Sequence, residues 1–290
     1  MSIRSILLVI ICVFLISCTQ KSNLEKEVKD MKTKGYELVW HDEFNESGQP
    51  DSTKWGYEHG FVRNKELQWY RPENAYVKDG LLILEARKEQ VENPNYDSTS
   101  SSWKLRRSHA DFTSASINTE GKQNFKYGIF TIRAKIDTSK GMWPAIWAVG
   151  NTTDRYWPAS GEIDIMEYYL ADGFPTILGN AAWAGEDDKT VWDDKKIPLT
   201  HFLEKDSKWV DQYHIWKMVW TEEQIKLLLD EELINKIDLN KTQNPDGFNP
   251  FHHPQVLRLN LAVGSSGGDP YNTQFPRQYK IDYVRVYQKK

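Results

Sequence analysis

The sequence predicts an all-β protein, a two-sheet antiparallel β-sandwich. Three observations favour this class: short runs rich in β-branched and aromatic residues recur between turn signals, helical periods are few, and no internal repeat is present. With 290 residues, 39% of them hydrophobic, the chain is long enough to bury one large core. The clearest expected strands are Leu81 to Ala86, Tyr127 to Ile136, Ile215 to Trp220, Ile225 to Leu229, Val256 to Val263 and Ile281 to Tyr287.

The N-terminal segment is predicted to be a signal peptide, residues 1–17. Arg4 precedes the apolar stretch Ile6 to Ile16, which has the length of a signal-peptide core and is too short to span a bilayer. The segment ends in Leu-Ile-Ser and Cys18, which resembles a bacterial lipobox, so cleavage before Cys18 and attachment of lipid to its sulfur are expected. An ordinary secretory signal followed by an unrelated cysteine is the alternative.

The next segment, residues 18–35, is polar and predicted to be a tether with a short helical turn at most. Both cysteines, Cys12 and Cys18, precede residues 36–290, so the folded domain has no internal disulfide. A lipid anchor would place the protein in a bacterial cell envelope, facing either the periplasm or the exterior. The net charge of −4, with both signs interspersed, does not suggest a nucleic-acid partner, and we expect a monomer.

Three carboxylates lie within one short apolar run, Glu162 to Glu167. Alternation along a strand places Glu162 and Asp164 on one face and would turn Glu167 toward the core. One extra residue, a β-bulge around Ile165 and Met166, would bring Glu167 back beside the other two acids. The sequence therefore predicts a bulged strand with three acids on one face.

Such a cluster suits hydrolysis of a glycosidic bond. A retaining glycosidase needs a carboxylate nucleophile and a protonated carboxylic acid about 5 to 5.5 Å apart. Asp164, between the two glutamates, would raise the pKa of at least one of them and keep it protonated. The alternatives are an edge strand protected by inward charges and a set of ligands for a hard cation.

The surrounding segments are similar to those of glycoside hydrolase family 16, the laminarinases, lichenases, agarases and related endo-β-glycanases. The resemblance covers about residues 37 to 288, in matching order. Its segments are Val39 to Phe44, Asn64 to Tyr70, Asp79 to Ala86, Thr113 to Ile117, Lys126 to Phe130, Gly141 to Gly150, Tyr156 to Pro158 with Gly161, and Ile281 to Gln288.

This resemblance implies a β-jelly roll in residues 36–290, with the acidic strand on the concave face of a substrate cleft. It implies that Glu162 is the nucleophile, Glu167 the acid/base, and Asp164 the residue that modulates them. The extra residue before Glu167 resembles the bulged motif of laminarinase-like members. No cofactor is expected for catalysis.

Aromatic and polar residues near these motifs are the candidates for substrate binding. The chain has 12 tryptophans, and an aromatic ring can stack on the C–H face of a pyranose, although any of them can belong to the core. Asn64 and Glu66 alternate as on one strand face, which by resemblance borders the cleft; a solvated edge strand is the alternative. The tryptophans expected in the cleft are Trp143, Trp147, Trp157 and Trp183.

A structural calcium site is implied by resemblance at Glu43, the backbone of Gly80 and Asp282, through hard oxygen ligands. The seven histidines show no metal-ligand spacing, so a zinc hydrolase is not expected.

The sequence indicates the identity of the substrate less clearly than the type of reaction. The strand expected after the acidic one lacks the usual histidine of laminarinases, and Ser116 stands where many relatives have arginine. We therefore expect loss of a basic donor in the cleft and, with Trp183 and Trp192, a reshaped binding face. β-1,3-Glucan or β-1,3/1,4-glucan is favoured. A β-galactan, an agar-type polymer or a host O-glycan is one alternative, and a non-catalytic surface glycan-binding lipoprotein is another.

Overall fold

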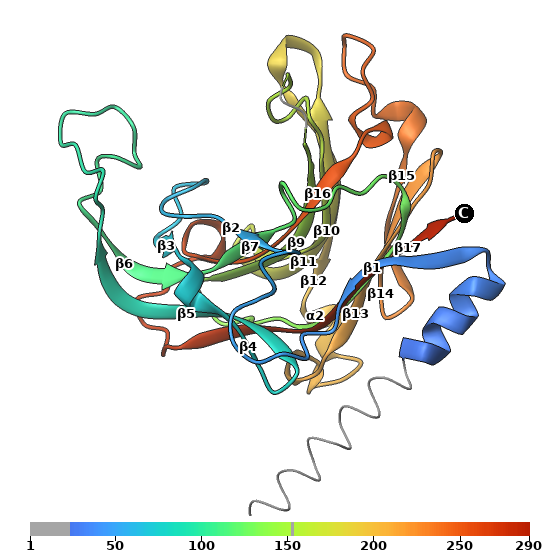
Figure 1. The fold of residues 1–290 in the computed structure, drawn as a ribbon. Coiled ribbons are helices and arrows are strands. Elements are labelled where there is room, and N and C mark those ends of the chain that lie inside the picture. Colours follow the sequence, from blue (N-terminus) through green and yellow to red (C-terminus); the bar gives the residue numbers. More distant parts are fainter. Residues whose placement is uncertain (1–23, 152–153) are drawn as a thin grey trace, which may run out of the picture.

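Two β-sheets lie face to face and curve so that one of them has a concave outer surface (Figure 1). The computed structural model describes residues 24–151 and 154–290, so the expected signal peptide and Cys18 lie outside the described residues. Each of the six runs expected to be strands forms one, and the predicted two-sheet sandwich is confirmed. Among the described residues, no helix combines the length and apolar composition needed to cross a membrane.

The concave sheet has seven strands and is antiparallel throughout. Its strands, in spatial order, are β12 (Thr190–Pro198), β11 (Phe174–Ala184), β10 (Glu162–Ala171), β9 (Met142–Gly150), β16 (Gln255–Val263), β7 (Ser116–Asn118) and β2 (Gly56–Tyr57). The acidic run is the start of β10, a central strand. This position argues against an edge strand with protective charges.

The second sheet has ten strands, antiparallel except where β3 runs parallel to β6. Its main path is β15 (Glu232–Asp238), β14 (Gln224–Leu229), β13 (His214–Trp220), β8 (Gly128–Lys135), β17 (Arg277–Lys289), β5 (Leu81–Glu92), β6 (His109–Ser114) and β3 (Gln68–Tyr70), with β1 (Tyr36–Asp42) on β17 and β4 (Ala75–Lys78) on β5. The short helical elements are α2 (Thr200–Leu203), η1 (Pro72–Asn74), η2 (Glu186–Asp188), η3 (Trp209–Asp211), η4 (Leu239–Lys241), η5 (Pro250–His252) and η6 (Ser265–Gly267).

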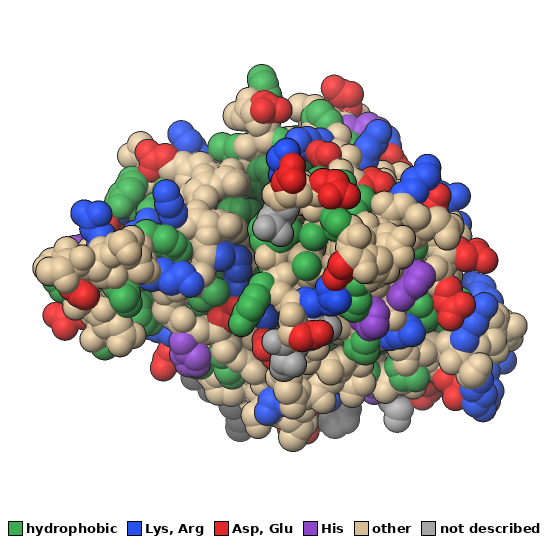
Figure 2. All heavy atoms as spheres, turned by 90° about the horizontal axis from the view of Figure 1, so that it is seen from above, with side chains coloured by type: hydrophobic (Ala, Val, Ile, Leu, Met, Phe, Trp, Pro, Cys, Tyr) green, Lys and Arg blue, Asp and Glu red, His purple; other side chains and the backbone are tan. Residues whose placement is uncertain are grey.

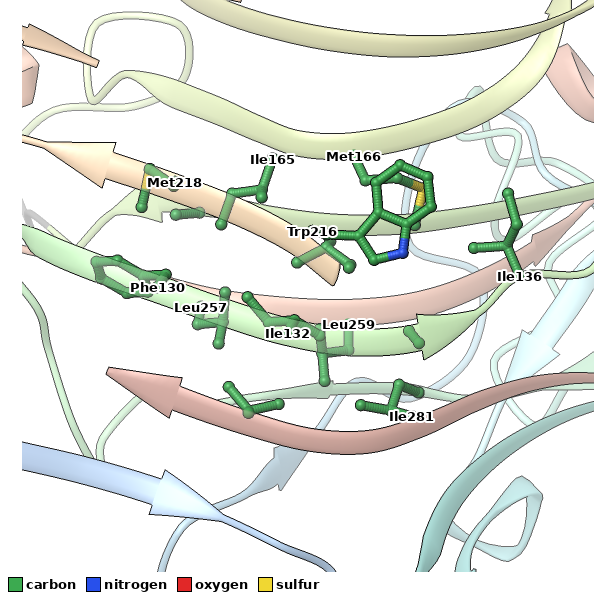
Figure 3. Close-up of a cluster of buried hydrophobic side chains, with 14 of the residues drawn as sticks. Phe130, Ile132, Ile136, Ile165, Met166, Trp216, Met218, Leu257, Leu259 and Ile281 are labelled. Atoms are coloured by element: carbon green, nitrogen blue, oxygen red, sulfur yellow. The ribbon is translucent and has the colours of Figure 1, made fainter. Parts of the chain in front are cut away.

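The core lies between the facing surfaces of the two sheets (Figure 3). Strand alternation explains its composition: in β13, Trp216 and Met218 are buried, while the alternating Ile215, Lys217 and Val219 are partly exposed. Leu257 and Leu259 of β16, in the concave sheet, belong to the same buried cluster. Since the domain has no disulfide, this apolar layer is its main source of stability.

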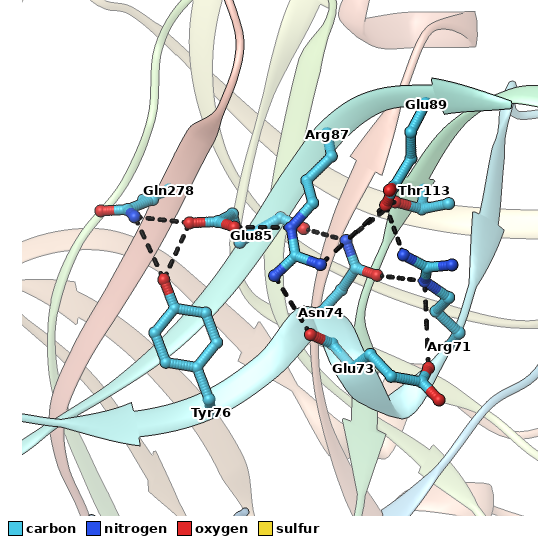
Figure 4. Close-up of polar contacts among 9 residues, drawn as sticks. All are labelled: Arg71, Glu73, Asn74, Tyr76, Glu85, Arg87, Glu89, Thr113 and Gln278. Atoms are coloured by element: carbon cyan, nitrogen blue, oxygen red, sulfur yellow. Dashed lines mark hydrogen bonds and ion pairs between the residues drawn. The ribbon is translucent and has the colours of Figure 1, made fainter. Parts of the chain in front are cut away.

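A polar network fastens η1 to the second sheet (Figure 4). Asn74 is fully buried, and its amide donates to the backbone oxygen of Glu85 (2.7 Å) and to the hydroxyl of Thr113 (2.9 Å), while its oxygen accepts from Arg71 (2.8 Å). The Glu85 carboxylate accepts hydrogen bonds from Tyr76 (2.8 Å), among others. Both the amide nitrogen and the oxygen of the buried Asn74 therefore have hydrogen-bond partners, which offsets the cost of burying them.

The described part of the predicted tether is a docked helix rather than an extended linker. Residues 24–33 are helical, and Met31 packs against Ile129 and Tyr287 on the outer face of the second sheet. Glu27 forms an ion pair with Arg285 of β17. The polar residues that suggested a tether lie on the solvent face of this helix. An apolar stripe and one ion pair hold its other face against the sheet.

Candidate active site

The acidic strand has the predicted bulge. The pairing of β10 with β9 shifts register between Asp164 and Met166, and the pairing with β11 shifts between Asp164 and Glu167. Ile165 and Met166 both enter the core (Figure 3), so Glu162, Asp164 and Glu167 share the concave face.

Gly161 allows β10 to begin at this place. Its φ is +77°, and a Cβ there would lie 2.6 Å from Cβ of Pro250. Any larger residue would displace the end of the strand that presents Glu162.

A cleft of about 600 Å³ lies over the concave sheet. Seen from above, the molecule is hollowed, and apolar, basic and acidic side chains meet around the hollow (Figure 2). The cleft is lined by Glu58, Val62, Arg63, Asn64, Glu66, Trp143, Ala145, Trp147, Val149, Trp157, Glu162, Asp164, Glu167, Tyr169, Trp192, Arg258, Asn260 and Ser266.

Strand register fixes the spacing of these residues. Asp164 pairs with Trp147 on one side and Asn180 on the other, and Trp147 pairs in turn with Arg258. Glu167 lies in the next row, opposite Ala145. Large and small cleft-lining side chains therefore alternate along β9, in the order Trp143, Ala145, Trp147 and Val149.

Two donors hold Glu167. The indole nitrogen Nε1 of Trp143 donates to its Oε1 (3.0 Å), and the amide Nδ2 of Asn180 lies 3.3 Å from its Oε2. The same Asn180 nitrogen lies 3.5 Å from Oδ2 of Asp164. Asn180 thus orients both acids from the neighbouring strand, a role that the sequence analysis missed. Alternation along β11 was the available signal, since it places Asn180 and Ala182 on the acidic face.

Burial raises the pKa values of all three acids, and repulsion from neighbouring carboxylates adds to this for Asp164 and Glu167. Burial raises the pKa of Glu162 to about 7, although Arg63, Trp157 and Arg258 oppose it. Burial and the charge of Glu162 raise the pKa of Glu167 to about 8. Asp164, 2% exposed, has a pKa well above its usual range through burial and both glutamates. Near neutral pH the cluster therefore retains protons, with Glu162 the easier of the two glutamates to ionise.

A second charged group occupies the same cleft. Arg63 and Arg258 both form ion pairs with Glu58, which also accepts a hydrogen bond from the Ser116 hydroxyl (2.6 Å). Their guanidinium carbons lie 5.0 and 5.3 Å from the ring centroid of Trp147. Position 116 supplies a hydroxyl rather than a basic donor, and the guanidinium groups of the cleft come from other segments, through Arg63 and Arg258.

Trp143, Trp147 and Trp157 line the cleft as predicted, but Trp183 does not. Trp183 is 8% exposed and packs in the core beside Phe251, with ring centroids 6.4 Å apart. It lies one residue beyond Ala182, which pairs with Trp192, so alternation turns Trp183 inward and Trp192 toward the cleft.

Asn64 and Glu66 also line the cleft, but they lie on a turn before β3 rather than on a strand. Asn64 and Lys65 have left-handed φ angles of 54° and 52°. The Asn64 amide donates to Oε1 of Glu66 (3.3 Å). Strand alternation was therefore the wrong reason for placing Asn64 and Glu66 at the cleft.

The residues predicted to bind calcium do not fit a hard cation. Both oxygens of Glu43 accept hydrogen bonds from Arg285 (2.9 and 2.7 Å), and Asp282 forms an ion pair with Arg133. Within residues 24–151 and 154–290, no cluster of three or more His, Cys, Asp or Glu side chains could hold a metal ion. Each of the two carboxylates already has a guanidinium partner where a cation would be needed.

The fold and the site together define a glycoside hydrolase, since paired carboxyl groups in an open, aromatic-lined cleft are the machinery of that class. A family model confirms the class: Glycosyl hydrolases family 16 matches residues 64–285, and the chain belongs to this family. It is an endo-acting β-glycosidase, as its relatives show.

The chain is 34% identical to the beta-glucanase of Rhodothermus marinus in an alignment 276 residues long, which covers 88% of this chain and 86% of that protein. It is 34% identical to the laminarinase catalytic domain of Thermotoga maritima MSB8, with a TM-score of 0.72 over 88% of this chain and 99% of that one. A structure described with endo-acting O-glycanases of the human gut microbiota, which initiate mucin breakdown, has 34% identity and a TM-score of 0.78, covering 88% and 92%.

Proposed function

We propose that the protein is a retaining endo-β-glycosidase that cleaves internal linkages of β-1,3- or mixed β-1,3/1,4-glucan. The observation that supports the reaction is the bulge in β10, which brings Glu162 and Glu167 to one face of an open cleft. The glucan assignment is supported by the similarity to a beta-glucanase and a laminarinase.

In the proposed reaction, the ionised carboxylate of Glu162 attacks the anomeric carbon and forms a glycosyl-enzyme ester. Glu167 donates its proton to the departing glycosidic oxygen, so the bond breaks without releasing an alkoxide. Glu167, now a carboxylate, then takes a proton from water, which attacks the same carbon and releases Glu162. Two inversions leave the anomeric configuration unchanged.

The neighbouring groups support these roles. Burial and the charge of Glu162 keep the pKa of Glu167 high enough for it to remain an acid near neutral pH. Trp143 and Asn180 fix its orientation. We propose that Asp164 modulates both glutamates from between them, since each of them in turn raises the pKa of Asp164.

The test is substitution of Glu162 by Gln. Glu162→Gln keeps the shape but removes the nucleophile, so we expect release of oligosaccharides from laminarin to fall by at least about 10³-fold. Glu232→Gln, a change at an exposed ion pair on β15, is the matched control. Full polymer cleavage by Glu162→Gln would overturn the assignment. Proton NMR of the first products distinguishes retention from inversion.

Galactosyl-linked O-glycans are a second candidate substrate, favoured by the similarity to the O-glycanase structure. A product assay against laminarin, mixed-linkage glucan, agarose, β-1,3-galactan and mucin O-glycans separates the candidates. Products from laminarin or mixed-linkage glucan alone support the glucan assignment, and products from mucin alone overturn it. Binding to a polymer with no products from any of them would favour a glycan-capture protein.

We propose further that Cys18 is lipidated and anchors the enzyme in the cell envelope. The support is the sequence Leu-Ile-Ser-Cys after an apolar segment. Metabolic labelling with an alkynyl fatty acid should mark the wild-type chain and leave Cys18→Ser unlabelled; equal labelling of both would contradict the proposal.

A further inference from the structure

The cleft contains a second group of side chains, the arginine cluster, which consists of Glu58, Arg63, Arg258 and Trp147. This cluster has no part in the two-carboxylate reaction. Its charged side chains are 11%, 22% and 15% exposed for Glu58, Arg63 and Arg258. It lies in the cleft beside the acidic strand, because Trp147 pairs with Asp164 across β9 and β10.

The charges of this cluster are not distributed equally. Arg258 has two carboxylate partners, Glu58 and Glu120, whereas Arg63 has Glu58 as its one ion-pair partner among the described residues. The Glu58 carboxylate also accepts hydrogen bonds from Arg258 and the Ser116 hydroxyl. Each arginine also has one buried nitrogen with no hydrogen-bond partner within the described part of the chain, Nη1 of Arg63 and Nε of Arg258. Arg63 therefore has one ion-pair partner fewer than Arg258, and Glu66 is a further acidic neighbour of its guanidinium.

The two glutamates of β10 face different charges. Arg63 is the strongest of the groups that lower the pKa of Glu162 against the effect of burial, and Arg258 acts in the same direction. Glu167 has Glu162 and Glu66 as charged neighbours, and both raise its pKa. Positive charge thus lies toward Glu162 and negative charge toward Glu167.

The other elements that form the cleft do not reverse this asymmetry. Its ionisable lining groups are Glu58, Arg63 and Glu66 from the segment before β3, Arg258 from β16, and Glu162, Asp164, Glu167 and Tyr169 from β10. The lining residues from β9 and β12 are not ionisable. The two arginines are the only cations among the lining residues.

We propose that Arg63, held against Trp147 by Glu58, is a positioning residue that keeps the negative charge of the carboxyl pair on Glu162 and thereby leaves the proton on Glu167. This inference rests on the proposed roles of Glu162 and Glu167. The alternative distribution, with the charge on Glu167 and the proton on Glu162, has neither a nucleophile nor an acid in the required place. Arg63 would then act through the population of the competent protonation state, without contacting the reacting atoms.

The acidic limb of the pH profile of kcat/KM tests this role, because it reports ionisation of the essential carboxylate in the free enzyme. Arg63→Met removes a positive charge, so the ionised form of Glu162 becomes less stable and the limb moves to higher pH, by about one unit. Arg63→Lys keeps the charge and should keep the limb close to its wild-type position. An unchanged limb in a folded Arg63→Met enzyme would overturn the proposal.

Arg107 provides a matched structural control. Its guanidinium donates to the backbone oxygens of Lys65 and Glu66, so it holds the same loop, but it does not line the cleft. Arg107→Met should loosen the loop without moving the acidic limb. If Arg107→Met gave the same shift as Arg63→Met, loop order rather than charge would be the cause and the proposal would fail.

Glu58→Gln gives a test of opposite sign that does not depend on the folding of Arg63→Met. Removing the counter-charge leaves the positive charge of Arg63 less neutralised, so the acidic limb should move to lower pH; no movement, or movement to higher pH, contradicts the inference. Glu162→Gln distinguishes failure of the proposed function from failure of the role of Arg63. If it retains cleavage, the proposed function itself fails, whereas an inactive Glu162→Gln with an unmoved limb in Arg63→Met removes only the role of Arg63.

Discussion

At the scale of single residues, the carboxyl cluster of β10 is arranged for reaction rather than for stability. Asp164 and Glu167 are held in surroundings that disfavour their ionised forms, and the hydrogen bonds from Asn180 and Trp143 only partly offset this. A raised pKa in the folded state means that folding becomes less favourable as pH rises from the unfolded pKa of about 4.3 through the folded value.

We therefore expect Glu167→Gln to lose activity and gain stability. A neutral amide avoids the cost of ionising a buried carboxyl group, and a gain of about 1 kcal/mol would raise Tm by about 2–4 °C in a domain of this size. The gain should be largest above about pH 8, where Glu167 ionises in the wild type, and should vanish near pH 4. Calorimetry at several pH values measures it; a lower Tm at pH 8 would contradict this account.

The two neighbouring tryptophans Trp183 and Trp192 should behave in opposite ways. Trp183 is in the core, so Trp183→Ala should cost about 3–5 kcal/mol in the free energy of unfolding. Trp192 is 42% exposed, lines the cleft and approaches Trp157, so Trp192→Ala should raise KM for the polymer while leaving Tm nearly unchanged. Urea unfolding and steady-state kinetics on both variants distinguish the two; a similar loss of stability in both would show the assignment to be wrong.

At the scale of elements, Arg285 links three parts of the chain. It is 2% exposed on β17, donates to both oxygens of Glu43 after β1, and forms an ion pair with Glu27 of the helix at 24–33. Burial raises the pKa of Glu43, but hydrogen bonds from Arg285 and His41 outweigh it, so the pKa lies below its usual value. The N-terminal helix is thereby part of the folded domain.

Arg285→Met should destabilise the protein by about 3–5 kcal/mol, because it removes the guanidinium partner of the buried carboxylate of Glu43. Since the pKa of Glu43 is lowered, this stabilisation is present above the unfolded pKa of about 4.3 and is lost as pH falls through the folded value. The double variant Glu43→Gln/Arg285→Met should recover part of the loss. Lys290→Met, at an exposed ion pair with Glu37, is the control and should have no measurable effect in urea unfolding. Equal effects of Arg285→Met and Lys290→Met would contradict this account.

At the scale of the whole molecule, the sandwich depends on its apolar layer and on internal ion pairs. The carboxylates of Glu43 and Asp282 have guanidinium partners from β17 and β8. A divalent cation would have to displace arginines that are already in place.

We therefore expect excess EDTA to leave Tm and glycosidase activity unchanged. Differential scanning calorimetry of the purified protein with EDTA, and again with added calcium, measures this. A fall in Tm with EDTA that calcium alone reverses would show that a structural cation is bound after all.

Patterns of short range were enough to predict much of this protein. Alternation of side chains, turn residues and the spacing of three acids predicted the sandwich, the six strands and the bulge at Ile165 and Met166, since each depends on neighbours in the chain. The family resemblance added the class of enzyme. Glu162, Asp164 and Glu167 could be found because one strand carries all three.

The rest was decided by tertiary structure, because it depends on residues far apart in the sequence. Arg63 and Arg258 meet on Trp147 from segments nearly 200 positions apart, and Ser116 joins them through Glu58, which no local pattern indicates. Strand register, set by cross-strand pairing, turned Trp183 into the core. A long-range ion pair likewise joins Arg285 to Glu43, whose carboxylate was expected to bind calcium. Sequence alone thus determined which acids share one face of β10 and are proposed to perform the chemistry, and packing determined which charges surround them.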